Sequence, residues 1–208
     1  MQAIIAIPDS GTLKRYGGTG ALMRKVSGVP LLARVIKTAV RAGADSLLVI
    51  WPSDVPRSIW LSAQAALDRE ALCGVIIVQQ DAFDPQPRAN WMEFFGILDE
   101  RFLWLPWNWV TNKKALDRLE LSRCFPIDWT LPIHLERAAI EKPGMHLCIG
   151  RPPDGVAVTS ARSAAEAERL LVAVSGKPPD SGNLFQRKVL RAPTIVTGDV
   201  NFEWNRQN

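Results

Sequence analysis

Ala3-Ile4-Ile5-Ala6-Ile7, followed by a glycine-rich segment at residues 10–20 and then by Gly28-Val29-Pro30-Leu31-Leu32, decides the fold class of this chain. The continuous apolar run at the start is typical of a central parallel strand that is covered on both faces. Apolar side chains at helical spacing predict a helix that begins near Pro30, and Gly43 predicts its C-terminal cap. The glycine-rich segment is expected to lack regular structure, and a second strand follows at residues 47–51. The unit is therefore a strand, a loop, a helix and a strand.

The alternation of short apolar runs with helical patterns continues through most of the 208 residues, which predicts a layered α/β fold. Further strands are expected at residues 74–78, 101–106, 145–149 and 155–159. Further helices are expected at residues 59–72 and 90–98, from an N-cap at Thr111 through Leu119, and from a capping box at residues 163–166 to about Val174. We therefore expect one domain at residues 1–175 and a tail or linker at residues 176–208.

The composition argues against several classes of function. Lys and Arg number 25 against 21 Asp and Glu, which gives a net charge of +4. The sequence contains no run of five or more basic residues, and this argues against a nucleic-acid partner. The excess suits a phosphate-rich small molecule, the anionic face of a membrane, or simply a solvated surface. Three scattered cysteines and two histidines favour neither a disulfide scaffold, nor a zinc site, nor a Ser/His/Asp triad. Because no signal peptide or membrane-spanning run is evident, the chain is expected to be cytoplasmic.

A flexible glycine loop between a strand and a helix is a common device for holding phosphate, because backbone N–H groups and basic side chains can approach the anion. The segment from Pro8 to Lys25 has these ingredients. It matches neither the P-loop spacing nor the G-x-G-x-x-G spacing of dinucleotide-binding folds. A surface loop without a ligand is therefore the alternative interpretation.

The order of these residues resembles the GT-A-type nucleotidyltransferases, which include sugar-phosphate nucleotidyltransferases, inositol-phosphate cytidylyltransferases and molybdenum-cofactor guanylyltransferase. Their opening pattern is roughly L-A-A-G-x-G-T-R, a variable loop, a lysine, V-x-G-x-P-L-L, and a helix that ends in A-G. The matching positions are Gly11, Thr12, Val26, Gly28, Pro30, Leu31, Leu32, Ala42 and Gly43. The resemblance covers about residues 1–160 and implies a Rossmann-like three-layer α/β/α sandwich with a mostly parallel central sheet.

The resemblance also implies a site and a reaction, in which CMP from CTP is transferred to the phosphate of a sugar or alcohol phosphate. The residues that would hold the nucleotide are Pro8, Asp9, Ser10, Gly11, Thr12 and Arg88. The candidate catalytic cations are Lys14, Arg15, Arg24 and Lys25. Mg²⁺ is the implied cofactor, and its candidate ligands are Asn108, at the position of the metal-binding aspartate of the family, and Asp154.

Three positions depart from the family pattern. Asp9 stands where the first glycine belongs, Leu13 replaces the arginine, and Gly20 lies where the lysine is expected. Asp9 would place a negative charge beside a triphosphate. Two hypotheses follow: an active nucleotidyltransferase, or a catalytically degenerate domain with a binding or regulatory role.

A second resemblance lies near the C-terminal end. Glu166-Ala167-Glu168-Arg169-Leu170-Leu171 and residues 176–182 resemble the junction between a cytosolic nucleotidyltransferase domain and a membrane-embedded CDP-alcohol phosphatidyltransferase. The likeness implies such an enzyme as a partner, a place at the inner face of the membrane, and a role in phospholipid head-group synthesis. The catalytic motif of the membrane half is absent from these residues, so the chain is either a soluble piece of such a protein or a stand-alone relative.

Overall fold

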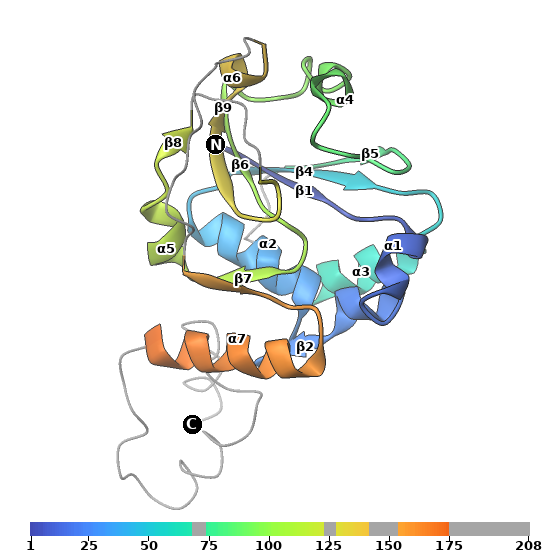
Figure 1. Cartoon of the computed structure of the whole chain (residues 1–208), viewed down its shortest axis with the longest axis vertical. Helices are drawn as coiled ribbons and strands as arrows, with labels where there is room; N and C mark the ends of the chain where they lie inside the picture. Colours follow the sequence, from blue (N-terminus) through green and yellow to red (C-terminus); the bar gives the residue numbers. More distant parts are fainter. Residues whose placement is uncertain (68–73, 123–127, 142–153, 175–208) are drawn as a thin grey trace, which may run out of the picture.

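The computed structural model describes residues 1–67, 74–122, 128–141 and 154–174 and contains a six-stranded sheet (Figure 1). The strand order is β5-β4-β1-β6-β9-β8. All neighbours are parallel except β6 and β9, which are antiparallel. The strands are β1 (Gln2–Ala6), β4 (Ser46–Trp51), β5 (Val75–Gln79), β6 (Arg101–Trp104), β8 (Leu121–Ser122) and β9 (Ile133–Glu136). The predicted mostly parallel central sheet is confirmed.

Helices cover both faces of this sheet and make the fold a three-layer α/β/α sandwich. Figure 1 shows α2 (Leu31–Arg41) and α3 (Arg57–Ala65) on one face, with α4 (Arg88–Met92) and α6 (Arg137–Glu141) on the other. Each face has its own apolar core. Alternate residues of β1 divide between the two cores, since Ile5 packs on the α2 side and Ile4 on the side of α4 and α6. The predicted fold class is therefore confirmed.

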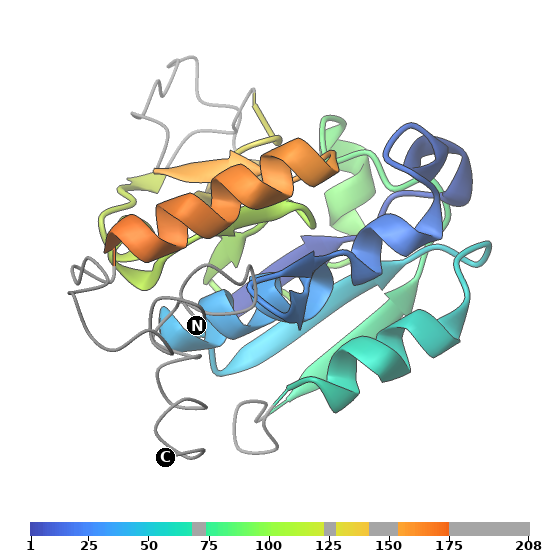
Figure 2. The same ribbon diagram turned by 90° about the horizontal axis from the view of Figure 1, so that it is seen from below.

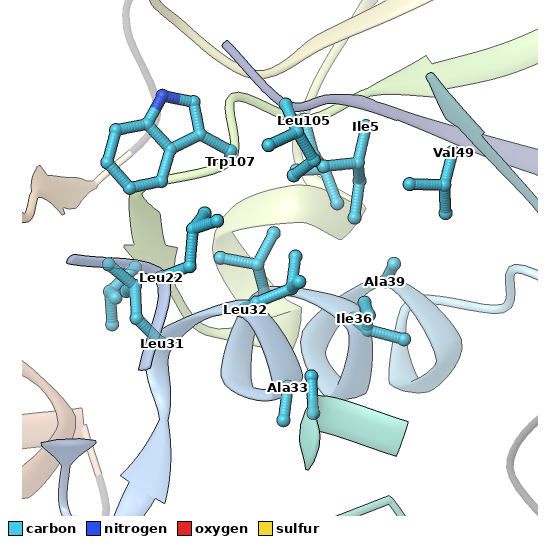
Figure 3. Close-up of a cluster of buried hydrophobic side chains, with 14 of the residues drawn as sticks. Ile5, Leu22, Leu31, Leu32, Ala33, Ile36, Ala39, Val49, Leu105 and Trp107 are labelled. Atoms are coloured by element: carbon cyan, nitrogen blue, oxygen red, sulfur yellow. The ribbon is translucent and has the colours of Figure 1, made fainter. Parts of the chain in front are cut away.

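The predicted helix after the glycine-rich segment is α2, and its apolar stripe packs on the sheet as expected. Figure 3 shows Leu32 pointing towards Ile5 and Leu105, and Ile36 belongs to the same buried cluster. Gly43 has φ of +94°, and its N–H donates to Val40 O at 3.0 Å, while the next N–H reaches Ala39 O. These two bonds form a Schellman cap, in which glycine is favoured because a Cβ is strained at positive φ.

A small ribbon and the helix α7 (Ala161–Val174) cover the side of α2 that faces away from the sheet. The strands β7 (Trp109–Thr111) and β10 (Gly155–Ala157) form an antiparallel ribbon, which lies between α2 and α7 in Figure 1. Figure 2 gives the same arrangement from below. The enclosure explains why even Arg34 and Lys37 are buried on this helix. Arg34 Nη2 donates to the carbonyls of Val26 and Ser27, at 3.2 and 3.3 Å.

The glycine-rich segment is more regular than we predicted. It contains α1 (Ser10–Lys14) and a 3₁₀ helix, η1 (Thr19–Met23). The expectation of no regular structure was wrong because Asp9 caps α1 through the Thr12 N–H, a local bond that outweighs the flexibility of Gly11. A short hairpin follows, with β2 (Lys25–Val26) and β3 (Val29–Pro30) joined by a two-residue turn.

Two predicted helix starts were also wrong, each by a small shift. Thr111 lies in β7, and the N-cap of α5 (Lys113–Asp117) is Asn112, whose side chain accepts from Ala115 N at 3.0 Å. The capping box of α7 joins Ser160 and Ser163, whose hydroxyl groups each accept from the backbone N–H of the other. The Ser163 hydroxyl oxygen takes the place of the carboxylate that a capping box usually has at this position. The helix α7 therefore begins three residues before the start predicted from Ser163 and Glu166.

Several sequence predictions lie outside the described residues. These are the strand at 145–149, the segment 176–208, and the end of the helix predicted at 59–72, of which α3 is the described part. In the described part of the chain, no helix is long and apolar enough to cross a membrane.

Candidate functional site

The loops that follow β1 and its parallel neighbours meet at the carboxyl ends of these strands, where ligands bind in many α/β folds. The loop after β1 is tied to the loop after β4, since Ser10 N donates to Asp54 Oδ2 at 2.9 Å. The loop after β4 is tied to the loop after β5, since Ser53 donates to Asp81 from both its N–H and its hydroxyl group. The carboxylates of Asp54 and Asp81 therefore join the three loops at the carboxyl ends of the strands.

Asp9 is the residue around which the candidate nucleotide loop is built. Its Oδ1 accepts from Thr12 N at 2.7 Å, and its Oδ2 accepts from Thr12 Oγ1 at 3.1 Å. Gly11 leaves room for this, because a Cβ there would lie 3.0 Å from Asp9 Oδ1. The Thr12 N–H holds the pKa of Asp9 below its usual value, so the carboxylate is charged at neutral pH.

Two backbone amides at the start of α1 are consequently occupied. The Ser10 N–H is used by Asp54 and the Thr12 N–H by Asp9. Asp9, Ser10, Gly11 and Thr12 are the predicted nucleotide-binding residues that follow Pro8. A phosphate group at these amides would have to displace two carboxylates whose charge has the same sign as its own.

The four predicted catalytic cations differ in their surroundings. Lys14, Arg15 and Lys25 are exposed, the first two at the end of α1 and the third on β2. Arg24 instead turns back into the loop. Its Nη2 donates to the Tyr16 carbonyl at 3.0 Å, and its Nη1 is buried with no hydrogen-bond partner among the described residues. Arg24 therefore acts in this structure as a brace of the loop.

Tyr16 links the same loop to the segment after β6. Its ring meets Trp107 edge-on, with the ring centroids 5.5 Å apart. Trp104 and Trp107 are both buried, at 4% and 8% exposure, as core packing at a strand end requires.

The structure does not bring Arg88 to the loop. Its guanidinium donates to the carbonyls of Ile140 and Glu141 at the end of α6, in the layer that covers the opposite face of the sheet. A cation there complements the negative end of a helix. Arg88 thus joins α4 to α6, and the candidate nucleotide loop lies elsewhere.

The two candidate Mg²⁺ ligands lie at opposite ends of the β7–β10 ribbon. The backbone of Asn108 bonds to Val158, whereas Asp154 lies beyond the pair formed by Gly155 and Thr111. About four residues of strand separate the two positions, roughly 13 Å at 3.3 Å per residue. Mg²⁺ binds its oxygens at about 2.1 Å, so these two residues do not fit one ion. No group of three His, Cys, Asp or Glu residues suited to a metal is found within the described residues.

Sequence reasoning missed two residues that close the loop, namely Asp54 and Tyr16. Asp54 follows a Pro-Ser pair in an exposed loop and belongs to no recognisable motif. Its partner Ser10 is 44 positions away, so only the pairing of β1 with β4 brings them together. No local signal in the sequence could have identified this contact.

The helix α7 is attached to the hairpin beside Arg24 and Lys25. Glu168 Oε1 accepts from the N–H of Ser27, the first turn residue, at 2.8 Å. Ser27 is only 1% exposed and has φ of +49°, and Gly28 follows with φ of +75°. Both residues of the turn thus adopt the left-handed region, as in a type I′ hairpin. The resemblance noted for residues 166–171 therefore falls on a helix that contacts the candidate loop segment.

Replacing Glu168 by alanine is expected to lower the free energy of unfolding by about 1–3 kcal/mol, because a buried N–H at Ser27 loses its acceptor. Glu168→Gln keeps an acceptor oxygen and should lose less. The control is Glu166→Ala, since Glu166 is exposed on the same helix. Urea denaturation monitored by circular dichroism measures the stability of all three variants. Equal losses from Glu168→Ala and Glu166→Ala would contradict a stabilising bond between Glu168 and Ser27.

Comparison with known proteins adds a likeness in fold. No protein-family model matches the sequence, and no curated protein matches it. Among solved structures, the inositol-1-phosphate CTP transferase from T. maritima is 13% identical with a TM-score of 0.43, covering 55% of this chain and 46% of that chain. A nucleotidyl transferase from Methanothermobacter thermautotroptrophicus is 17% identical with a TM-score of 0.42, covering 58% of this chain and 57% of that chain. This chain therefore spans about half the length of these two proteins, and neither likeness bears on its activity.

Proposed function

We propose that this chain is a nucleotidyltransferase-like domain that has lost nucleotidyl transfer and serves as a binding or regulatory domain. The observation that carries the proposal is the occupation of the Ser10 and Thr12 amides by the carboxylates of Asp54 and Asp9. The ancestry rests on the sequence pattern from Val26 to Gly43, which is intact, whereas the departures at Asp9, Leu13 and Gly20 fall where the chemistry would be.

The chemistry of the family explains why this occupation matters. Transfer of a nucleotidyl group is catalysed mainly by positioning the phosphates and by neutralising the charge that develops on them. In this chain the amides are used by carboxylates and Arg24 braces Tyr16, while Asn108 and Asp154 are too far apart to hold one ion. The amide and metal contributions that the reaction needs are therefore occupied or separated, and of the four candidate cations Arg24 is engaged within the chain.

The second candidate function is active transfer of CMP from CTP to a sugar or alcohol phosphate, with release of pyrophosphate. The observation in its favour is the exposure of Lys14 and Arg15 beside the loop, with Lys25 on the adjacent hairpin. These side chains remain able to meet phosphate groups. In this case the acceptor phosphate would attack the α-phosphorus of the nucleotide, and the cations would stabilise the leaving pyrophosphate.

The proposed setting is beside a membrane-embedded CDP-alcohol phosphatidyltransferase. The support is the sequence of α7, whose Glu166-Ala167-Glu168-Arg169 run resembles the junction in such proteins. Through Glu168, α7 contacts the hairpin that follows the candidate loop. A domain in this position could sense or steady its partner without carrying out transfer itself.

Calorimetric titration with CTP, GTP, ATP and UTP in the presence of Mg²⁺, combined with an assay of pyrophosphate release, tests the proposal. We expect no saturable heat and no pyrophosphate with any acceptor phosphate tried. The paired variants are Lys14→Ala/Arg15→Ala at the loop and Lys113→Ala/Lys114→Ala, an equally exposed pair on α5, as the control. Pyrophosphate release that the first pair abolishes and the second leaves unchanged would establish the active enzyme instead.

A further inference from the structure

β5 is the last strand of the described sheet, and β4 is its only neighbour there. Leu47 N donates to Gly74 O at 2.9 Å, and Gln80 N donates to Trp51 O at 3.0 Å. Alternate residues of a parallel strand bond to the same neighbour. Residues 74, 76, 78 and 80 therefore direct their backbone groups towards β4. Val75, Ile77 and Gln79 direct theirs outward, and no described strand pairs with them.

Among the described residues, this outer edge lacks the features that usually protect a sheet. Natural edge strands are blunted by lysine, proline, bulges or a covering element. The sequence Val75-Ile76-Ile77-Val78-Gln79 contains no charge and no proline, and four of its five residues are β-branched. The Ile76 side chain is 42% exposed on it. An apolar edge of this kind is a template for another strand.

We infer that β5 pairs with β5 of a second copy of this chain, antiparallel and about a two-fold axis at Ile77. The three outward residues are spaced symmetrically around Ile77, so the register satisfies all of them. Ile77 bonds reciprocally to its counterpart, and Val75 of each copy bonds to Gln79 of the other. The exposed Ile76 then lies opposite Val78 of the other copy, on the face of the sheet that α4 covers only in part.

The charges on and beside β5 agree with this occupant. The paired strands contain no charged residue, and the acid that follows them, Asp81, would lie about 27 Å from its counterpart, at opposite ends of the ribbon. Repulsion over that distance is screened at physiological ionic strength. A contact centred on five residues per copy is small for a protein interface. The dimer should therefore be weak and dependent on concentration, in the micromolar range.

Sedimentation velocity of the full 208-residue chain, from low micromolar to submillimolar concentration, measures this association. Ile76→Lys should raise the dissociation constant of the dimer about tenfold or more, because pairing of the two β5 strands would then bury a charged lysine from each copy. Ile77→Pro removes an outward N–H that β4 does not use, and should have the same effect. Ile97→Lys is the control, since Ile97 is 37% exposed but lies away from β5. Its backbone carbonyl accepts from the Gln2 side chain on β1, which is two strands from β5 in the sheet.

Hydrogen exchange of the Ile77 amide makes the test independent of folding defects in the variants. In the wild-type chain we expect protection of this amide only at concentrations where the dimer forms. A chain that is monomeric at all concentrations overturns the inference, as does a dimer that Ile97→Lys weakens as much as Ile76→Lys. Protection of Ile77 already in the monomer also overturns it, since another part of the same chain would then cover the edge.

Discussion

Replacing Trp91 by alanine is expected to lower the free energy of unfolding by about 3–5 kcal/mol, the range for removing a fully buried large aromatic side chain. Trp91 is 0% exposed and lies at the centre of the core beneath α4. Its ring stacks on Trp129 with centroids 5.0 Å apart and on Phe102 at 5.7 Å. Its Nε1 also donates to Pro85 O at 2.8 Å. Truncation would remove all of these contacts and leave a cavity that the rigid neighbouring rings cannot fill.

Chemical denaturation in urea measures this effect, and Met92→Ala is the matched control. Met92 is the next residue on α4 but is 56% exposed, so its loss should change stability little. Trp91→Phe retains an aromatic ring and should fall between the two. If Trp91→Ala and Met92→Ala shift the denaturation midpoint equally, the aromatic cluster does not hold α4 to the sheet.

Gly155→Ala is the second substitution for which a large effect is expected. A Cβ at this position would lie 2.3 Å from Trp109 Nε1 and 2.6 Å from Trp109 Cε2, distances that no packed pair of atoms tolerates. The two residues belong to adjacent strands of the β7–β10 ribbon, and the indole is rigid. We expect a loss of about 1–3 kcal/mol in the free energy of unfolding, as for other overpacked sites.

A double-mutant cycle identifies the clash as the cause. Adding Gly155→Ala to a Trp109→Ala background should have little effect, since the indole that opposes the methyl group is gone. Gly96→Ala serves as the control glycine, because a Cβ there meets nothing within 4 Å. Equal losses from Gly155→Ala in both backgrounds would locate the cause in the backbone.

The central unit of the fold was predictable because its signals are local. A continuous apolar run predicted β1, helical spacing of apolar residues predicted α2, and Gly43 predicted where α2 ends. The edge strand β5 was likewise expected within one residue of its position. Such patterns depend only on neighbouring residues, so one sequence contains them in full.

The candidate site was less predictable because its contacts are not local. Asp9 was recognised as a departure from the family pattern, but its role as the cap of α1 depends on the turn that Gly11 permits. The contact between Ser10 and Asp54 depends on strand pairing. Arg88 lay in a polar loop that suggested an available cation, whereas α6 packs beside α4 and offers it two carbonyl groups. Charge alone did not indicate which partner each side chain would find.

The amide resonances of Ser10 and Thr12, followed by NMR, test the central claim most directly. Because the pKa of Asp9 is lowered in the folded protein, its capping bond is present at neutral pH and is lost as the pH falls through that lowered value. We predict that the Thr12 amide shifts on this acidification in the wild-type chain and loses the response in Asp9→Asn. At neutral pH, saturating CTP with Mg²⁺ should leave both amides unmoved. A saturable shift of the Ser10 and Thr12 amides with CTP would contradict the account and show that the loop releases its own carboxylates to take up a nucleotide.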